Sequence, residues 1–216
     1  MTQMTNTNKL TVAIPTHGMD DKEFFFKRCL DSLWNQTFQD FGIVVTDNSD
    51  DEVIKSMCAY YGGIDYYQNP IKGMAQNTNE AIRRSTGQYI KILYMDDFLS
   101  HDNVLETLMK KIGNWVIMGS DNNINPRWTD DIYTGNNKLG SPSALAFIND
   151  EPLLFDENLT WLLDCELYGR LYQRYGEPTI ISGDHIGIGE GLHQMTYSIP
   201  DERKLLEKDY LLKNHV

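Results

Sequence analysis

The residues best suited to chemistry in this sequence are carboxylates that follow predicted strands. Asp96 and Asp97 come directly after the apolar run 89–95, and Asp47 comes shortly after the apolar run 41–45. Carboxylates on a short turn can hold Mg²⁺ or Mn²⁺ by one or two oxygens and leave the other positions of the ion to substrate phosphates. An isolated Asp pair can equally be a helix N-cap in a solvent-facing turn. The pair alone therefore leaves a cation site and a structural cap open.

Alternating strand and helix signals must position these carboxylates. Short apolar, β-branched runs predict strands, and apolar residues at helical spacing predict the helices between them. Strands are predicted at 10–14, 41–45, 64–67, 89–95, 115–118 and 179–181, an ordered segment at 144–148, and helices near 24–34, 53–61, 74–85, 105–112, 162–175 and 201–213. This alternation predicts an α/β fold with a mostly parallel central sheet flanked by helices.

Polar clusters occupy the carboxyl ends of three predicted strands, where ligands of parallel sheets collect. They are Pro15-Thr16-His17-Gly18, Thr46-Asp47-Asn48-Ser49 and Met95-Asp96-Asp97. Between residues 120 and 140 the pattern of strands and helices fails, and the chain is rich in Asn, Asp and Gly. A polar segment of this length within a compact domain is usually a lid or a binding loop.

Length and composition restrict the class of protein. The chain has 216 residues, 41% of them hydrophobic, which suits one domain with a sizeable core and excludes a disordered chain. We expect residues 1–8 to form a flexible tail and residues 9–216 a single domain. No apolar run reaches the roughly 18 to 20 residues of a membrane span, so no stable membrane insertion is expected. Three widely spaced cysteines fit neither a disulfide framework nor a zinc site and indicate a reducing, cytoplasmic location.

The charge balance bears on partners. The chain carries 31 acidic residues against 19 Lys and Arg, a formal net charge of −12. This argues against gripping a nucleic-acid backbone, although a local basic patch such as Lys110-Lys111 or Arg83-Arg84 would allow it. Carboxylates in a cleft can instead hold a divalent cation that carries a phosphate group, and the acidic balance favours this option.

The order of the motifs resembles that of the family 2 inverting glycosyltransferases, which have the nucleotide-binding GT-A fold. The resemblance extends over roughly residues 9–198. In the first half, the matching segments are Pro15-Thr16-His17-Gly18 after the first strand, Thr46-Asp47-Asn48-Ser49 after the second, and residues 73–87 with Gly73, Asn79, Ile82 and Gly87. The D-x-D-D motif of the family matches Tyr94-Met95-Asp96-Asp97, and its G-x-P-S strand matches Gly140-Ser141-Pro142-Ser143. The last match is an acidic helix start at Leu163-Asp164-Cys165-Glu166-Leu167, which leads to Arg170-Leu171.

The resemblance implies a nucleotide-binding half at 9–98, an acceptor-binding half at 99–200 and a C-terminal helix at 201–216. It implies a donor that is a nucleotide-diphosphate sugar, with a UDP sugar expected, and a Mn²⁺ or Mg²⁺ cofactor. By the same resemblance the nucleotide would be bound by Pro15, Thr16, His17, Asp47, Asn79 and Asp96, and the metal by Asp96, Asp97 and His193.

For the reaction itself, the resemblance makes Asp164 the catalytic base that takes the proton of the acceptor hydroxyl. A carboxylate near a helix N-terminus that only favours the helix dipole is the alternative. The acceptor expected from the family is a glycan or a lipid-linked saccharide. Trp128, Tyr133 and Trp161 are predicted to stack on sugar faces, with Trp128 preferred for its polar neighbours, although aromatic residues of this kind can also be core.

Two positions depart from the family pattern and keep alternatives open. Tyr94 stands where the family has the first Asp of its D-x-D motif, and Thr78 stands where it has an Arg. A catalytically silent nucleotide- or sugar-binding module of the same fold is therefore an alternative. Transfer to a non-glycan acceptor such as a modified nucleobase is another. A nucleotidyltransferase would need a Gly-rich basic loop after the first strand, and residues 16–21 are acidic instead.

Overall fold

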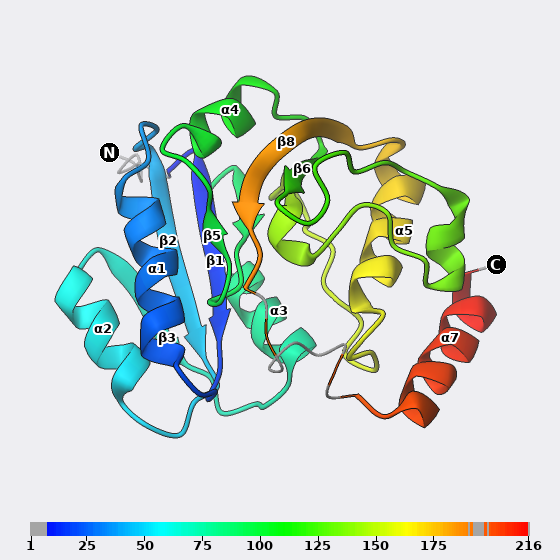
Figure 1. The fold of residues 1–216 in the computed structure, drawn as a ribbon, viewed down its shortest axis with the longest axis horizontal. Helices are drawn as coiled ribbons and strands as arrows, with labels where there is room; N and C mark the ends of the chain where they lie inside the picture. The colour runs from blue at the N-terminus through cyan, green and yellow to red at the C-terminus, as the bar shows by residue number, and fades with distance from the viewer. Residues whose placement is uncertain (1–7, 190, 192–196, 198, 216) are drawn as a thin grey trace, which may run out of the picture.

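The computed structural model describes residues 8–189, 191, 197 and 199–215, which form an α/β fold around an eight-stranded sheet (Figure 1). The order of the strands is β3-β2-β1-β4-β7-β6-β8-β5. The strands are β1 (Leu10–Thr16), β2 (Phe41–Asp47), β3 (Ile64–Gln68), β4 (Tyr89–Ile92), β5 (Phe98–Leu99), β6 (Trp115–Ser120), β7 (Leu145–Ile148) and β8 (Thr179–Gly187). The helices are α1 (Lys22–Trp34), α2 (Val53–Tyr61), α3 (Met74–Arg84), α4 (Val104–Lys110), α5 (Leu163–Tyr175) and α7 (Asp201–His215), with 3₁₀ turns η1 (Asp130–Thr134) and η2 (Pro142–Ala144).

The sheet is mostly parallel, and the predicted α/β class is confirmed. Strands β1 to β4 run parallel to their neighbours in the order β3-β2-β1-β4, and β6 runs parallel to β8. Strand β7 is antiparallel to both β4 and β6, and β5 is antiparallel to β8. The carboxyl ends of β1, β2 and β4 therefore lie at one edge of the sheet, as the positions of their polar clusters require.

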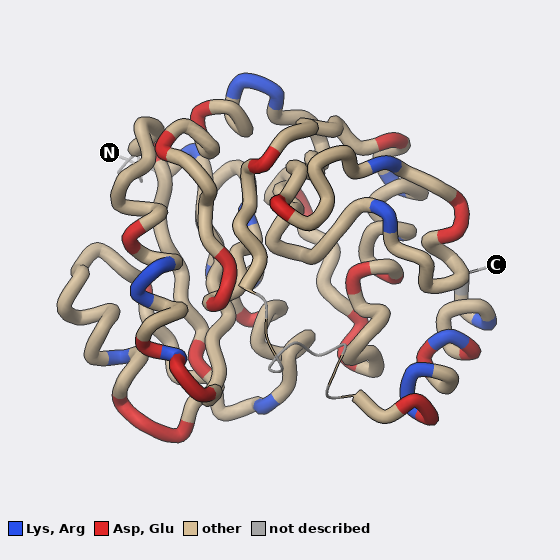
Figure 2. The backbone as a smooth tube through the Cα atoms, viewed as in Figure 1, with Lys and Arg blue, Asp and Glu red and all other residues tan. Residues whose placement is uncertain are grey.

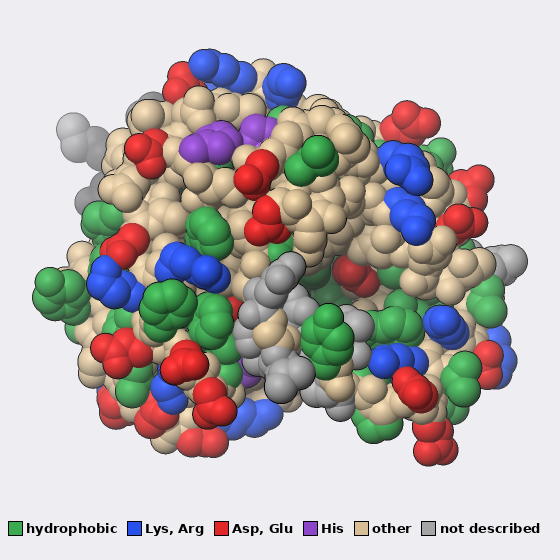
Figure 3. Space-filling model, in the orientation of Figure 1, with side chains coloured by type: hydrophobic (Ala, Val, Ile, Leu, Met, Phe, Trp, Pro, Cys, Tyr) green, Lys and Arg blue, Asp and Glu red, His purple; other side chains and the backbone are tan. Residues whose placement is uncertain are grey.

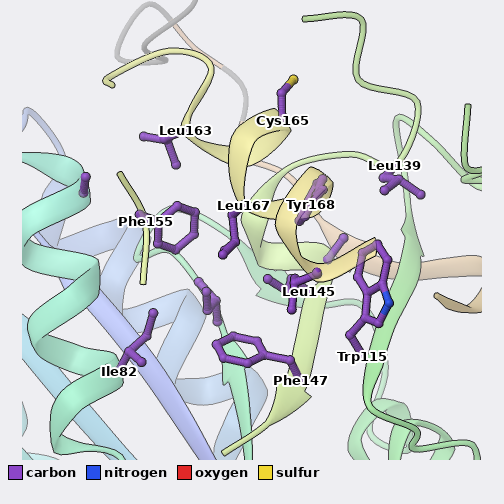
Figure 4. Close-up of a cluster of buried hydrophobic side chains, with 14 of the residues drawn as sticks. Ile82, Trp115, Leu139, Leu145, Phe147, Phe155, Leu163, Cys165, Leu167 and Tyr168 are labelled. Atoms are coloured by element: carbon purple, nitrogen blue, oxygen red, sulfur yellow. The ribbon is translucent and has the colours of Figure 1, made fainter. Parts of the chain in front are cut away.

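Both faces of the sheet are covered, because successive strand residues point to opposite sides. In β1, Leu10, Val12 and Ile14 join a core with residues of α1 and α4, whereas Ala13 joins a second core. In that second core, residues of α3 and α5 pack on the other side of the sheet; Figure 4 shows side chains of α5 next to Phe147 of β7 and Trp115 of β6. Covered on both faces, the strands present their ends, not their sides, to ligands.

Three segments differ from the sequence prediction. Strand β4 ends at Ile92 and not at Met95, because the Tyr94 backbone N–H donates to Ser143 Oγ (2.9 Å) and the chain turns, with Asp97 N–H donating to the Tyr94 carbonyl (3.0 Å). The expected strand at 140–143 is instead a coil that enters the 3₁₀ turn η2. Strand β8 continues past Ile181 to Gly187, since its far end pairs with β5.

Other expectations concern the termini and the cysteines. The predicted tail lies, except for residue 8, outside the described residues. The three cysteines, Cys29, Cys58 and Cys165, are buried thiols without disulfide bonds. Within the described ranges, none of the helices combines the length and apolarity needed to cross a bilayer.

Candidate functional site

A cavity of about 900 Å³ opens at the carboxyl ends of the strands, between β1, β2 and α3 on one side and the start of α5 on the other. The surface is hollowed near the centre of the view in Figure 3. The residues predicted to bind nucleotide, metal or acceptor that line this cavity are Pro15, Thr16, His17, Asp96, Asp97 and Trp161, and the predicted catalytic base Asp164 lines it too. The fold thus brings together residues that are as much as 149 positions apart in the sequence, from Pro15 to Asp164.

The first two polar clusters meet at the floor of the cavity. Thr16 Oγ1 donates to Asp47 Oδ1 (2.9 Å), so the ends of β1 and β2 are tied through their side chains. Asp47 itself is fully buried and does not line the cavity, because its carboxylate also accepts from the Ser49 N–H and hydroxyl (2.8 Å each) and from the Tyr66 hydroxyl (3.0 Å). Four hydrogen bonds thus hold the Asp47 carboxylate below the surface of the cavity. A nucleobase could reach this carboxylate only if some of these bonds were exchanged.

Asn79, which was predicted to bind the nucleotide, does not line the cavity and instead holds the chain near Phe155. Its side chain accepts from the Phe155 N–H (2.7 Å) and donates to the Phe155 carbonyl (2.9 Å) and to Glu157 Oε1 (3.0 Å), away from the cavity. The cavity is lined instead by Asn77, which donates to the carbonyls of Thr16 and Thr46 (2.9 Å each). Two residues apart on a helix means a rotation of about 200°, so only one of the two asparagines can face the strands.

Asp96 and Asp97 lie on the turn after β4 and are fixed from two sides. The Asp96 carbonyl accepts from Arg28 Nη2 of α1 (2.6 Å). Asp97 Oδ1 accepts from the Gly189 N–H (2.8 Å), from the segment after β8. Gly189 fits only because it has no side chain: a Cβ there would lie 2.4 Å from the Asp96 carbonyl oxygen. The pair that the sequence placed at a strand end is therefore held rigidly at the cavity wall.

Opposing effects act on the pKa of Asp97. Asp97 is 3% exposed, and burial together with the neighbouring Asp96 carboxylate raises its pKa above the usual range of an aspartate. The fully buried Lys91 of β4, which sequence reasoning missed, lowers the pKa of Asp97 in return. The Lys91 ammonium donates to the carbonyls of Ile92 (2.7 Å) and Ser143, and burial lowers its own pKa to about 7. A buried lysine in a strand gives no sequence signal that separates it from an exposed one.

Asp164 lies in the first turn of α5 and faces the cavity. Its Oδ1 accepts from the Cys165 N–H (2.7 Å) and its Oδ2 from the Asn137 side-chain amide (2.7 Å). Burial raises the pKa of the Asp164 carboxyl, while these two hydrogen bonds act in the opposite direction. A carboxylate with a raised pKa and a fixed orientation is suited to accept a proton.

Trp161 lines the cavity at the turn before α5, and α7 holds this turn in place. Glu207 of α7 is 2% exposed, and its carboxylate accepts from the backbone N–H groups of Thr160 (3.0 Å), Trp161 (2.8 Å) and Leu162 (3.0 Å). Two further α7 residues, Lys204 and Lys208, lie with their ammonium groups 5.6 Å from the centre of the Trp161 ring. The last helix therefore supports one wall of the cavity.

Trp128 and Tyr133 do not line the cavity. Trp128 stacks on Tyr172 of α5, with ring centres 4.0 Å apart and planes at 5°, and Tyr133 packs at Gly169 of the same helix. Both belong to the partly buried residues around the core of α3 and α5. The polar neighbours that favoured an acceptor role for Trp128 reflect the loop around it, not the place of its ring. We therefore leave these two residues out of the acceptor site proposed below.

The cavity is acidic. Its described lining contains four carboxylates, Asp50, Asp96, Asp97 and Asp164, and one cation, Lys72. Across the part of the chain that the structure describes, no three His, Cys, Asp or Glu side chains converge to enclose a metal ion. The oxygen donors of Asp96 and Asp97 nevertheless fit Mg²⁺ or Mn²⁺, which often take only one or two carboxylates from the protein. His193, predicted as a further ligand, lies outside the described residues.

Three residues of the two candidate basic patches form ion pairs with acidic side chains. Arg83 and Arg84 each form an ion pair with Glu80, and Lys110 pairs with Glu106 (2.7 Å). Along the backbone, Lys and Arg occur as short stretches separated by acidic ones (Figure 2). This distribution gives no support to a nucleic-acid-binding face.

Comparison with protein families identifies the family of this chain. The model of "Glycosyl transferase family 2" matches residues 11–161, about 70% of the chain. Among curated relatives, the glycosyltransferase GlyA of Streptococcus pneumoniae is 28% identical over 109 residues, which are 49% of this chain and 15% of that protein. The rhamnosyltransferase WbbL of Escherichia coli is 31% identical over 101 residues, 44% of this chain and 37% of the relative. The chain thus spans well under half the length of these relatives.

Solved structures share the fold. S. aureus TarS (residues 1–349) in complex with UDP-GlcNAc superposes with a TM-score of 0.69 at 16% identity, covering 94% of this chain and 70% of that one. The mannosyltransferase PcManGT from Pyrobaculum calidifontis, in complex with GDP-Man and Mn²⁺, gives a TM-score of 0.62 at 16% identity, covering 88% and 59%. At this level of identity the likeness concerns the arrangement of the chain.

Proposed function

Since the chain belongs to glycosyl transferase family 2, we propose that it transfers a sugar from a nucleotide-diphosphate donor to an acceptor hydroxyl, with a divalent cation and with inversion at the anomeric carbon. The observation that supports this proposal is that Asp96, Asp97 and Asp164 line one cavity at the carboxyl ends of the strands. Asp96 and Asp97 would supply oxygen ligands for a cation, and Asp164 supplies an oriented carboxylate.

The charge of the cavity supports the need for a cation. A diphosphate that entered without one would face, among the described residues of the lining, four carboxylates and the lysine Lys72. Asp96 and Asp97 would hold the ion, the diphosphate oxygens would complete its ligands, and the ion would stabilise the negative charge of the departing nucleoside diphosphate. Thr16 and His17 lie at the carboxyl end of β1, where the nucleoside part of the donor would bind. A UDP sugar is our first expectation for the donor.

Asp164 would act as the general base. As the acceptor oxygen forms its bond to the anomeric carbon, its proton passes to the Asp164 carboxylate. The bond between that carbon and the phosphate oxygen breaks, and its electron pair leaves with the nucleoside diphosphate. Because attack comes from the side opposite the leaving group, the configuration inverts. Trp161, on the same wall, would contact the acceptor, for which we propose a glycan or a lipid-linked saccharide.

The first test is a thermal-shift panel of UDP, GDP, dTDP, CDP and ADP, each with Mn²⁺ and with EDTA. A ligand at 100 times its Kd adds about 2.7 kcal/mol to the free energy of unfolding, which is about 5 to 10 °C for a chain of this size. We expect one diphosphate to raise the Tm with Mn²⁺ and not with EDTA. The absence of any shift would contradict donor binding. A metal-dependent shift without release of the diphosphate in the presence of sugar donors would identify a silent binding module.

Two variants separate the roles of the carboxylates. Asp96→Ala should abolish the difference between Mn²⁺ and EDTA in nucleotide affinity, while Asp20→Ala, an exposed residue outside the cavity lining, should preserve it. Asp164→Asn should keep nucleotide affinity and lower the transfer rate about 100-fold or more, as loss of a general base does. Wild-type affinity with and without EDTA in the first variant, or a wild-type rate in the second, would remove that residue from the mechanism.

A further inference from the structure

Asn137, in the loop before η2, uses every hydrogen bond that an asparagine side chain can make. Its Nδ2 donates to the Gly140 carbonyl (2.8 Å) and to Asp164 Oδ2 (2.7 Å). Its Oδ1 accepts from the backbone N–H groups of Leu139 (2.7 Å) and Gly140 (3.1 Å). An amide has two donor hydrogens and two acceptor lone pairs, so none is left for a substrate. The two backbone donors also fix which end of the amide is oxygen, and hence that the nitrogen faces Asp164.

The loop that carries Asn137 is attached to α5 at a second point. The Tyr168 hydroxyl lies within hydrogen-bond distance of the carbonyls of Gly140 (3.2 Å) and Ser141 (3.0 Å). Tyr168 comes four residues after Asp164 and therefore lies on the same face of the helix. Gly140 has φ 108°, a left-handed conformation that favours glycine and turns the loop back toward the helix. These contacts fix the position of the loop relative to helix α5 and so place the Asn137 nitrogen next to the Asp164 carboxylate.

The two oxygens of Asp164 are held by different elements. The Cys165 N–H of α5 holds Oδ1, and Asn137 from the loop holds Oδ2, so the carboxylate cannot rotate without breaking a hydrogen bond. Both bonds favour the ionised form against the effect of burial. Among the described residues, titratable groups that interact with Asp164 include the phenols of Tyr94 and Tyr168 and the Cys165 thiol. Burial raises the pKa of each, so all three are neutral near pH 7.

From this geometry we infer that Asn137 is the positioning residue of the catalytic base: it orients the Asp164 carboxylate toward the cavity and keeps it ionised, without touching the substrate. The inference rests on the proposed function, because it assigns Asn137 a role in catalysis only if Asp164 is the base. The Asn137–Asp164 contact itself can be tested without any substrate.

The test is a pH titration of the Asp164 carboxyl by NMR, in protein labelled with ¹³C at the aspartate side-chain carboxyl. The signal that disappears in Asp164→Asn is assigned to Asp164. We expect Asn137→Ala to raise the pKa of Asp164 by about one to two pH units, since a hydrogen bond to a charged group is lost. Asn136→Ala is the matched control, because Asn136 is exposed and its amide faces Asp131 (3.4 Å); it should leave the titration unchanged. Equal titrations in wild type and Asn137→Ala would overturn the inference.

A second measurement uses the wild-type protein. In the wild type, the side-chain N–H signals of Asn137 should shift with pH at the same midpoint as the Asp164 carboxyl, and signals that ignore this titration would also overturn the inference. In the transfer assay, Asn137→Ala should move the acidic limb of the rate profile to higher pH and leave nucleotide affinity unchanged. If Asp164→Asn keeps its rate, Asp164 is not the base, and the catalytic role of Asn137 fails with it. If Asp164→Asn loses its rate and only the Asn137→Ala profile stays at the wild-type position, the inference alone fails.

Discussion

Replacement of Glu207 by glutamine tests whether the last helix holds the cavity wall. The side chains have almost the same shape, but the chemistry at the buried end differs. The Glu207 carboxylate accepts four hydrogen bonds: three from the backbone N–H groups of residues 160–162 and one from Arg203 Nε (2.8 Å). Glutamine has one oxygen, which can accept two of these bonds, and its amide nitrogen would face the other two donors.

The expected loss follows from these two stranded donors. A buried donor left without an acceptor costs about 1–3 kcal/mol, so Glu207→Gln should lower the free energy of unfolding by about 2–6 kcal/mol. For a chain of this size each kcal/mol corresponds to about 2–4 °C, so the Tm should fall by at least about 4 °C. Arg203 can turn toward solvent, because its side chain is about half exposed, which places the expectation at the lower end of the range.

The assays are urea and thermal unfolding, together with hydrogen exchange of the amides of residues 160–162. Glu202→Gln is the control, because Glu202 is exposed in the first turn of the same helix and should change stability by less than about 0.5 kcal/mol. We expect the three amides to exchange faster in Glu207→Gln than in the control. A Tm within about 1 °C of the wild type, with unchanged exchange at these amides, would refute the reasoning.

Three further outcomes are expected. Gly189→Ala should weaken metal-dependent nucleotide binding in the thermal-shift panel, because the new Cβ requires the Asp96 backbone to move; an unchanged shift would show that the turn adapts. Asn79→Ala should lower the free energy of unfolding in urea by about 1–3 kcal/mol, since it strands the buried Phe155 N–H, while leaving nucleotide affinity at the wild-type value. The transfer rate should fall as the pH drops through the raised pKa of Asp164, because a base must be ionised to accept a proton; an acidic limb in the usual range of an exposed aspartate would contradict the role assigned to burial.

The sequence was sufficient for the framework of the site. Alternation of apolar strands and helices predicted the α/β class, and the polar residues at strand ends predicted that Thr16 and Asp96 would meet at one edge. These predictions succeeded because both depend on local periodicity and on the direction of parallel strands.

The rest depended on contacts between distant segments. Sequence spacing cannot decide which of Asn77 and Asn79 faces the strands, since the choice follows from the packing of α3 on β1 and β2. The polar surroundings of Trp128 gave no sign of its stacking on Tyr172, 44 residues later in the chain. Asn137 and Glu207 carry ordinary polar side chains, and only the tertiary structure shows that one holds a carboxylate and the other a backbone turn.

The acidic lining of the cavity also has a consequence for the rate of ligand encounter. The chain has a net charge of −12, and the described lining of the site holds four carboxylates, so a free diphosphate is repelled at distances up to about 10 Å, the Debye length at 0.1 M salt. Added monovalent salt should therefore speed the association of the metal-free nucleotide by screening this repulsion. The same field concentrates divalent cations near the protein, and a nucleotide already paired with such an ion carries two fewer negative charges. If the protein acts as proposed, electrostatic steering would favour arrival of the donor as its metal complex.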